Sequence, residues 1–326
     1  MCLAKRERTR QTCCSLSKMK TIFISIAAYR DPQLVATMQS ALDNAIYPEN
    51  LHFGVALQYD EEPDLSSFEN VSTISYNPDQ RPGIVRVRHN ISKLYSGQDF
   101  YLQIDSHYQF AFGWDKYLLD GYEKISKEQN THKIMILPLE PYTDGIMTSK
   151  FTLALEDRPF GKIAHPHPVN DKTLEDCGAY HEITFARVGQ IFFPGSYLSE
   201  VGFDPFSQVS LEIPYFSYRT IMSGYKVFQL NEKVLWQSDA EYYSAVWEGR
   251  EAEETYRDPN RFKSDAVFEG MSTWNEMSLA FIYNDFSKYA IKDAVMSAED
   301  FWKMQGAHQE YLDAKKYFDL ALYNNL

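Results

Sequence analysis

The residues with the clearest chemical potential are Asp105 and His107, two positions apart directly after the apolar run that ends at Ile104. In extended chain this spacing puts both side chains on the same side. A carboxylate and an imidazole so placed can share one hard or borderline cation such as Mn²⁺ or Mg²⁺. Such a cation would bind a nucleotide diphosphate and neutralise its charge as it leaves. The alternative is that Asp105 caps the next turn and His107 is a surface histidine.

Three arginines, Arg81, Arg86 and Arg88, crowd a short stretch of an acidic chain. Arginine presents a planar fork of donors that matches phosphate or carboxylate oxygens. This stretch therefore indicates an anion-binding pocket. The alternative is that these arginines only form ion pairs with the surplus carboxylates.

For two further pairs of residues the sequence allows more than one role. Glu212 and Arg219 are seven residues apart, which is two turns along one helix face. Glu212 can accept hydrogen bonds from sugar hydroxyls, or it can pair with Arg219, and the spacing favours neither. His165 and His167 flank Pro166, and we interpret them as exposed loop histidines, with a metal site as the alternative.

The pattern of apolar residues predicts the elements that must position these side chains. Up to about residue 140, short runs rich in β-branched residues alternate with helical patterns, which predicts an α/β fold with a mostly parallel, doubly wound sheet. Asp31-Pro32 begins the first helix, since Asp is a good N-cap and Pro is tolerated in the first turn. The predicted strands span 21–28, 51–58, 71–75, 100–104 and 133–138, and the later predicted helices span 84–94 and 114–126.

In such sheets the ligand lies at the carboxyl ends of the strands. The first, second and fourth predicted strands each end in polar residues. We therefore expect three clusters to converge on one rim of the sheet: Tyr29-Arg30-Asp31, Gln58-Tyr59-Asp60 and Asp105-Ser106-His107.

The pattern changes after residue 140. Prolines and glycines interrupt residues 140–185, which we interpret as a long functional loop region. Order returns with a predicted helix at 211–222, which Gly224 terminates, and with predicted strands at 226–229 and 233–236. Beyond about residue 240 the chain is acidic, aromatic and mostly helical in pattern, and we expect these aromatic residues to cover the core.

Composition narrows the classes of function. The 326 residues carry a net charge of −13, which argues against nucleic acid as a main partner, because phosphate polymers need clustered Lys and Arg. No apolar run approaches the roughly 20 residues that span a bilayer. Motifs typical of serine hydrolases, P-loop enzymes, dinucleotide enzymes and zinc ribbons are absent from the sequence.

The first 20 residues hold six Lys and Arg against one Glu, and three of the four cysteines. We interpret residues 1–19 as a disordered or non-native leader, because Met19-Lys20 directly precedes the first strand pattern. The rest of the chain has only Cys177, which predicts no internal disulfide and favours a reducing, cytoplasmic compartment.

Several segments resemble one family of glycosyltransferases. They are IFISIAAYRDPQL, GVALQYD and GIVRVRHNISKLYSGQDFYLQIDSHYQFAFGWDKYLL. The family is typified by the cytoplasmic protein-hydroxyproline N-acetylglucosaminyltransferases and includes bacterial relatives. The run Tyr-Leu-Gln-Ile-Asp-Ser-His, followed by Gly-Trp-Asp, is the most specific match. The resemblance covers residues 20–240, with a weaker similarity to about 310.

This resemblance implies a GT-A fold and a role for each matching residue. Asp105 and His107 match the metal-binding D-x-H of the family, Arg88 matches an arginine near the diphosphate, and Glu212 matches a glutamate that faces sugar or acceptor. Asp105 and Glu212 are therefore the predicted catalytic residues. The predicted UDP-sugar contacts are Ser25, Ala27, Tyr29, Arg30, Gln58, Arg86, Arg88, Gln103, Ile104, Asp105 and Ser106.

The sequence departs from the family at two places near the site. The family has a histidine after its late strand as a third metal ligand, whereas this chain has Gln237, followed by Asp239. Either residue offers an oxygen ligand that suits Mn²⁺ or Mg²⁺. The second glutamate of a family pair is replaced by Ile213.

The resemblance implies a metal-dependent, retaining transferase that moves N-acetylglucosamine from a UDP-sugar to a hydroxyl acceptor. UDP-galactose and UDP-glucose are the second choices of donor. We expect a bacterial surface glycan as acceptor, with a protein hydroxyproline as the alternative. A catalytically weakened nucleotide-sugar-binding protein is the alternative from another class, and a glycoside hydrolase is disfavoured because it needs two facing carboxylates and no diphosphate site.

The expected organisation follows from the same segments. Residues 20–240 form the glycosyltransferase domain, and residues 241–326 form a helical C-terminal extension packed on it. A homo-oligomer is one expectation for the assembly, and no nucleic acid or transmembrane segment is expected.

Overall fold

The computed structural model describes residues 19–77, 79, 82–139, 146–158, 161–173, 178–205, 209–238, 277–284 and 289–324. Several features discussed above lie outside the described residues. They are residues 1–18 of the predicted leader, Arg81, Cys177, Asp239 and, from the predicted C-terminal extension, residues 241–276.

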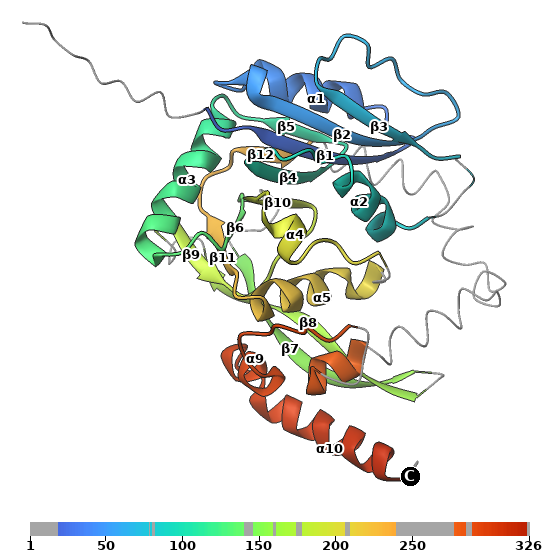
Figure 1. Cartoon of the computed structure of the whole chain (residues 1–326). Coiled ribbons are helices and arrows are strands. Elements are labelled where there is room, and N and C mark those ends of the chain that lie inside the picture. Colours follow the sequence, from blue (N-terminus) through green and yellow to red (C-terminus); the bar gives the residue numbers. More distant parts are fainter. Residues whose placement is uncertain are drawn as a thin grey trace, which may run out of the picture.

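One eight-stranded sheet, ordered β3-β2-β1-β4-β10-β6-β11-β9, forms the centre of the molecule (Figure 1). Its first half is parallel and consists of β1 (Ile22–Tyr29), β2 (Leu51–Gln58), β3 (Val71–Ser75) and β4 (Phe100–Asp105). β1, β2 and β4 are buried over nearly their whole length, which explains their continuous apolar sequences. These four strands confirm the alternating pattern predicted from the sequence.

The second half of the sheet is mixed. β10 (Gln190–Pro194) runs antiparallel between β4 and β6 (Ile134–Leu137). β11 (Lys226–Leu230) is parallel to β6, and β9 (Tyr180–Ile183) is antiparallel to β11. Because β10 pairs directly with β4, the chain just before β10 reaches the carboxyl end of β4, where Asp105 lies.

Helices cover both faces of the sheet. The helices are α1 (Leu34–Asp43), α2 (Ile84–Ser92), α3 (Trp114–Gln129), α4 (Tyr197–Glu200) and α5 (Val209–Met222), with a short 3₁₀ turn, η1 (Pro48–Asn50). One core contains α1 and α3 residues, and the other contains α2 and α5 residues. Adjacent strand residues divide between them, as Phe192 and Phe193 of β10 show.

A small second sheet closes over the end of β4. β5 (Tyr108–Phe110) pairs antiparallel with β12 (Leu235–Gln237), and Gln237 lies opposite Tyr108. The sequence predicted the later strand but not its partner. This pairing brings the segment around residue 237 next to His107, which precedes β5.

The segment predicted as a long irregular loop forms a hairpin, and that prediction was wrong. β7 (Ile146–Arg158) and β8 (Gly161–Thr173) pair over their length as a separate two-stranded sheet. Phe151 and Leu153 are buried on one face, so hydrophobic packing stabilises the strands. Each strand of a two-stranded sheet is also an edge, and an edge tolerates prolines such as Pro166 and Pro168.

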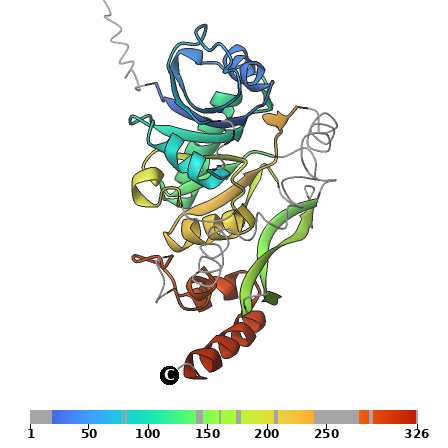
Figure 2. The same cartoon turned by 90° about the vertical axis from the view of Figure 1, so that its right-hand side faces the viewer.

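The described residues of the C-terminal part, 277–284 and 289–324, are mostly helical, as predicted. They include a helix at 277–283, α9 (Ala298–Met304) and α10 (His308–Asn324). Tyr215 of α5 donates a hydrogen bond to the Tyr289 carbonyl at 2.9 Å, and Tyr218 donates to the Ala280 carbonyl at 2.9 Å. α9 begins at a side-chain cap, because Ser297 Oγ accepts the amide of Asp300 at 3.0 Å. Figure 2 shows α10 at the end of the molecule opposite β1–β3. Across the described residues, no helix has the length and hydropathy to cross a membrane.

Candidate active site

Asp105 and His107 stand at the carboxyl end of the central parallel strand. Asp105 is the last residue of β4, and His107 follows it in the turn to β5. Their side chains are 27% and 17% exposed, so each is partly accessible from solvent. β1 lies beside β4 in parallel register, with Ala27 opposite Asp105, so the end of β1 reaches the same rim.

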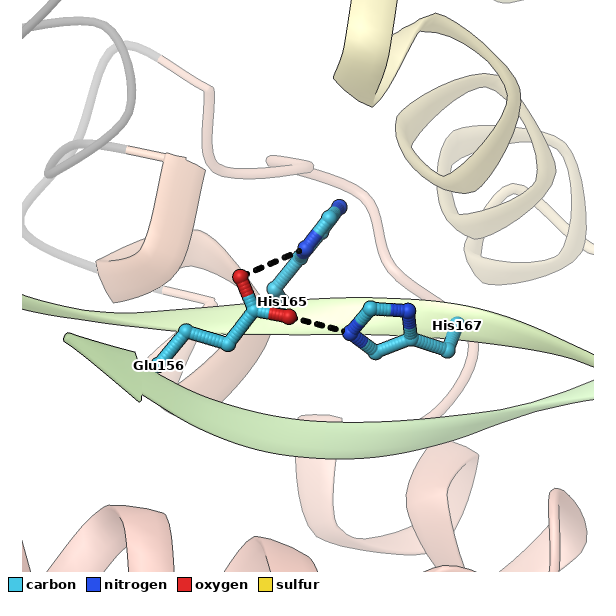
Figure 3. Close-up of side chains that lie close together, drawn as sticks. All are labelled: Glu156, His165 and His167. Atoms are coloured by element: carbon cyan, nitrogen blue, oxygen red, sulfur yellow. Dashed lines mark hydrogen bonds and ion pairs between the residues drawn. The ribbon is translucent and has the colours of Figure 1, made fainter. Parts of the chain in front are cut away.

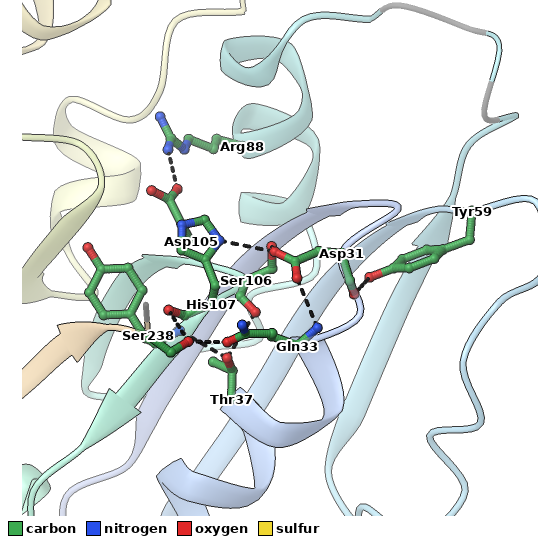
Figure 4. A network of polar contacts seen from close by, with 10 residues as sticks. Asp31, Gln33, Thr37, Tyr59, Arg88, Asp105, Ser106, His107 and Ser238 are labelled. Carbon is green, nitrogen blue, oxygen red and sulfur yellow. Dashed lines mark hydrogen bonds and ion pairs between the residues drawn. The ribbon is translucent and has the colours of Figure 1, made fainter. Parts of the chain in front are cut away.

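Asp31 orients the His107 ring. Asp31 Oδ2 accepts a hydrogen bond from Ser106 Oγ at 2.6 Å and contacts His107 Nδ1 at 3.0 Å (Figure 4). A carboxylate oxygen accepts, so Nδ1 carries the proton in this contact and the lone pair of the neutral ring is on Nε2. Asp31 Oδ1 also accepts the amide of Gln33 at 2.9 Å, ahead of α1. The prediction that Asp31 caps the first helix was wrong, because the N-cap of α1 is Gln33 and has no side-chain cap. Asp31 instead binds the Gln33 amide in the turn before α1 and fixes His107.

The first turn of α1 supports the turn that contains Ser106 and His107. Thr37 Oγ1 donates to the Ser106 carbonyl at 2.9 Å and accepts the Tyr108 amide at 2.9 Å. Tyr59, after β2, donates its hydroxyl to the Asp31 carbonyl at 2.6 Å. The turn is thus fixed by segments that the sheet brings together, which is the arrangement that positions a ligand precisely enough for catalysis.

Arg88 of α2 links the two predicted catalytic carboxylates. Its side chain is 5% exposed; Nη2 donates to Asp105 Oδ1 at 2.8 Å, and Nη1 donates to Glu212 Oε1 of α5. Burial alone would lower the pKa of Arg88, but the Glu212 and Asp105 carboxylates outweigh it and raise that pKa, so Arg88 stays charged.

The alternative that Glu212 pairs with Arg219 does not hold. Arg219 instead donates to the carbonyls of Gly202 at 3.0 Å and Val201 at 2.5 Å. Glu212 pairs with Arg88, 124 positions earlier in the chain, and so belongs to the same cluster as Asp105. Arg88 was interpreted from the sequence either as part of an anion-binding pocket or as an ion-pair partner of carboxylates. It forms ion pairs, and both of its partners are themselves predicted site residues.

The loop before β10 adds two residues that the sequence analysis missed. A Cβ built on Gly189 would lie 3.3 Å from Asp105 Oδ2, which is tighter than ordinary contact, so a glycine lets the loop pack against that carboxylate. Burial lowers the pKa of nearby Arg187, whereas the neighbouring Tyr108 hydroxyl acts to raise it. No motif marked either residue, because their place at the site depends on β10 pairing with β4.

The segment proposed to supply a third metal ligand lies beside His107. Ser238 donates its amide to the His107 carbonyl at 2.8 Å, and its hydroxyl contacts the Gln33 side chain. The Gln237 side chain is hydrogen-bonded to the Tyr108 hydroxyl. Gln237 is therefore next to the predicted metal site, and its role as a ligand stays a prediction.

The remaining predicted donor contacts fall into an interior and a rim group. In the interior, Ser25 donates to Gln103 Oε1 at 3.1 Å, and Ser25, Gln103 and Ile104 are buried. On the rim, Tyr29 is 47% exposed, and the Arg30 amide donates to the Gln58 carbonyl at 3.0 Å.

Arg30 and Arg86 differ in their surroundings. Arg30 Nε and Nη2 form a two-pronged ion pair with Asp60, at 2.7 Å and 2.9 Å. Arg86 is exposed on α2, whereas Arg88, two positions on, is buried. The structure thus confirms that the ends of β1, β2 and β4 lie on one rim, and it brings Arg88 but not Arg86 to Asp105.

The donor set at this rim fits a divalent cation. Asp105 offers a carboxylate whose Oδ1 accepts from Arg88, and His107 offers an imidazole whose Nδ1 contacts Asp31. One carboxylate and one imidazole, oriented by a second carboxylate, suit Mn²⁺ and similar borderline ions.

Comparison with known proteins assigns this fold. The family model described as Glycosyltransferase (GlcNAc) matches residues 21–68 and 61–264. The chain belongs to this GlcNAc glycosyltransferase family. No curated protein matches this glycosyltransferase in sequence.

Among solved structures, the glycosyltransferase is similar to one described as the crystal structure of GalNAc-T7 with UDP, GalNAc and Mn²⁺. The TM-score is 0.54 at 15% identity, over 92% of this chain and 57% of that one. At this identity the likeness concerns the fold, and it confirms the predicted GT-A architecture. The glycosyltransferase spans little more than half the length of that protein.

Proposed function

We propose that this enzyme transfers N-acetylglucosamine from UDP-N-acetylglucosamine to a hydroxyl acceptor, with a divalent cation and with retention of the donor's α configuration. The observation that carries the proposal is the Asp105–His107 pair on the strand rim, with His107 oriented by Asp31 and Asp105 by Arg88. The family assignment supports the sugar. The solved neighbour, which holds UDP and Mn²⁺, supports the class of donor and cation.

Asp105 and His107 Nε2 are the residues that would hold Mn²⁺ or Mg²⁺. When bound, the cation supplies charge neutralisation to the diphosphate of the donor. Asp31 has a supporting role, because the hydrogen bond to Nδ1 selects the tautomer of His107 that can bind a cation and fixes the ring plane.

Arg88 contributes positive charge between the two carboxylates and offsets their mutual repulsion. With both amino groups engaged by Asp105 and Glu212, the guanidinium is rigid, so no side-chain reorganisation is needed during the reaction. In this proposal Glu212, fixed through Oε1, accepts a hydrogen bond from a hydroxyl of the donor sugar, and Tyr29, Arg30 and Gln58 on the rim contact the uridine.

We propose front-face displacement for the stereochemistry. The two carboxylates of this cluster, Asp105 and Glu212, are both bound to Arg88, which weakens either as a nucleophile. The chain then acts mainly by holding the acceptor hydroxyl beside the anomeric carbon. The leaving phosphate takes the acceptor proton. A bacterial surface glycan is the acceptor that we propose, with a protein hydroxyproline as the alternative.

A nucleotide-sugar-binding protein with weakened catalysis is the second candidate. The observation that favours it is Gln237, which stands where the resembling family has a metal-binding histidine and is hydrogen-bonded to Tyr108. Such a protein would bind the donor without cleaving it.

The decisive experiment measures UDP release from UDP-N-acetylglucosamine by the wild-type chain with Mn²⁺, and again with excess EDTA. A transferase releases UDP slowly without an acceptor and stops in EDTA. The Asp105→Asn variant is expected to lose this release while retaining its fold. Metal-independent release, or equal release by Asp105→Asn, would contradict the site. Donor binding without any release would favour the binding protein.

A further inference from the structure

A second cluster of metal-ligating side chains lies on the β7–β8 hairpin. Glu156 of β7 and His165 and His167 of β8 place one potential ligand atom each within 4.8 Å of one another. Glu156 Oε2 lies 3.1 Å from His165 Nδ1, and Glu156 Oε1 lies 2.5 Å from His167 Nε2. Figure 3 shows the two imidazoles and the carboxylate pointing toward one another.

The backbone fixes these three residues on one face of the hairpin. His165 and His167 are two apart on a strand, so they project to the same side. Ala154 lies opposite His165, and Glu156, two positions on from Ala154, shares that face. The two ring centroids are 4.4 Å apart.

The sequence His165-Pro166-His167-Pro168 adds rigidity. A residue that precedes proline is restricted to extended conformations, and both histidines precede one. Each proline in turn has a fixed φ. The two imidazoles are therefore held side by side by the covalent chain as well as by strand pairing, which lowers the entropy that a ligand must remove on binding.

We propose that Glu156, His165 and His167 form a binding site for a divalent transition metal of the Zn²⁺ class. Two imidazoles and one carboxylate are a donor set that Zn²⁺ uses, with water or another ligand at the fourth position. The side chains of Glu156 and His165 are 25% and 14% exposed, and that of His167 is 41% exposed, so an ion can enter from solvent.

This site is independent of the proposed glycosyl transfer. Its ligands belong to a two-stranded sheet that is separate from the sheet containing Asp105. In Figure 1 the hairpin lies beside α9 and α10, with α5 between it and the end of β4. Because β7 packs against α10 and β8 against α5, a bound ion would stabilise the hairpin that joins the domain to the C-terminal helices.

A carboxylate between two imidazoles can also form an ion-paired cluster that binds no metal. The affinity for Zn²⁺ distinguishes these two interpretations. The experiment uses the full chain without a polyhistidine tag, freed of metal with a chelator. Zn²⁺ alone is titrated at pH 7.5 against a chromogenic competitor, for the wild type and for His165→Asn, His167→Asn and Glu156→Gln. The Asp105→Asn variant removes any contribution of the strand rim.

We expect one Zn²⁺ equivalent at this cluster, and at least about tenfold weaker binding in each histidine variant, because each removes one of three ligands. Binding should persist in Asp105→Asn. The matched control is His308→Asn, since His308 also pairs with a glutamate, Glu299, at 3.1 Å, but has no second histidine there. This variant should bind Zn²⁺ like the wild type.

Thermal unfolding with Zn²⁺ and the His167→Asn variant test the proposal further. Zn²⁺ should raise the unfolding temperature of the wild type and of His308→Asn but not of His167→Asn, because only a ligand that binds the folded state stabilises it. If His165→Asn does not fold, His167→Asn, at a more exposed side chain, decides the question. Equal Zn²⁺ affinity in the wild type and His167→Asn, or no binding by the wild type, overturns the site.

Discussion

The strand rim around Asp105 and the β7–β8 hairpin both combine histidine with carboxylate, but they are assembled in opposite ways. At the rim, each side chain comes from a different element, and Arg88, Asp105 and Glu212 meet only because α2, β4 and α5 pack together. On the hairpin, local strand pairing alone brings the ligands together. The rim therefore depends on the whole fold, whereas the hairpin site depends on one supersecondary unit.

The two regions also differ in the contacts that hold their histidine rings in place. Asp31 binds His107 Nδ1 and lies outside the proposed ligand pair, so a second carboxylate orients the ring. On the hairpin, Glu156 contacts both imidazoles itself and has to change partners when a metal binds. The rim is preorganised for a ligand through supporting contacts, and the hairpin is preorganised through its backbone.

The largest effect should follow from removing Arg88. Arg88→Met leaves Asp105 and Glu212 as neighbouring carboxylates without their shared cation, in a place where the Arg88 side chain is buried. Breaking a buried ion pair on one side costs about 3–5 kcal/mol of stability. Urea unfolding should show this loss, and UDP release should disappear.

The matched control is Arg86→Met, two positions away on the same helix but exposed. It should change the free energy of unfolding by less than about 0.5 kcal/mol. Equal stability of the two variants would show that the buried triad is not a structural part of the rim.

A smaller effect, confined to the metal, should follow from Asp31→Asn. The amide oxygen can still accept from Ser106 and His107 at the position of Oδ2, but the amide NH₂ then faces the Gln33 amide that Oδ1 accepts in the wild type. The neutral side chain also attracts the Nδ1 proton less strongly than a carboxylate, so the His107 ring is less firmly oriented. Loss of such a supporting contact costs about 10–100-fold in metal affinity or activity. The Mn²⁺ concentration for half-maximal UDP release should rise accordingly, with little change in the rate at saturating Mn²⁺.

Asp60→Asn serves as its control, because Asp60 pairs with Arg30 on the exposed rim and does not contact His107. Its Mn²⁺ dependence should match the wild type. A shift of the same size in both variants would mean that Asp31 acts on the rim in general and not through His107.

These contacts show which features of the structure can be predicted from the sequence and which cannot. Hydrophobic periodicity predicted β1, β2, β3 and β4, because each strand is a continuous local pattern, and it predicted the rim that the ends of β1, β2 and β4 share. It could not pair Arg88 with Glu212 across 124 positions, since that contact depends on how α2 and α5 pack. The hairpin was missed because its prolines were interpreted as loop signals, although an edge strand tolerates them.

Gly189 shows the same limit at a single residue. Its importance comes from β10 running antiparallel beside β4, which no periodicity predicts. Gly189→Ala would put a Cβ 3.3 Å from Asp105 Oδ2, so one of the two neighbours must shift by a few tenths of an ångström. We expect UDP release to fall by about tenfold or less, because small displacements of a catalytic group reduce rate without unfolding the chain. Wild-type release at all Mn²⁺ concentrations would show that Oδ2 faces away from the reaction.

The smallest effect is expected from a substitution that gives the rim a second histidine, as the hairpin has. Gln237→His would restore the residue that the resembling family has there, next to His107 in the β5–β12 pair. It also removes the hydrogen bond between Gln237 and Tyr108, so a modest loss of stability, about 1 kcal/mol, is expected in urea unfolding. If residue 237 faces the cation, the Mn²⁺ requirement for UDP release should fall a few-fold despite that loss. An unchanged or higher requirement would mean that residue 237 supports Tyr108 and that Asp105 and His107 alone hold the ion.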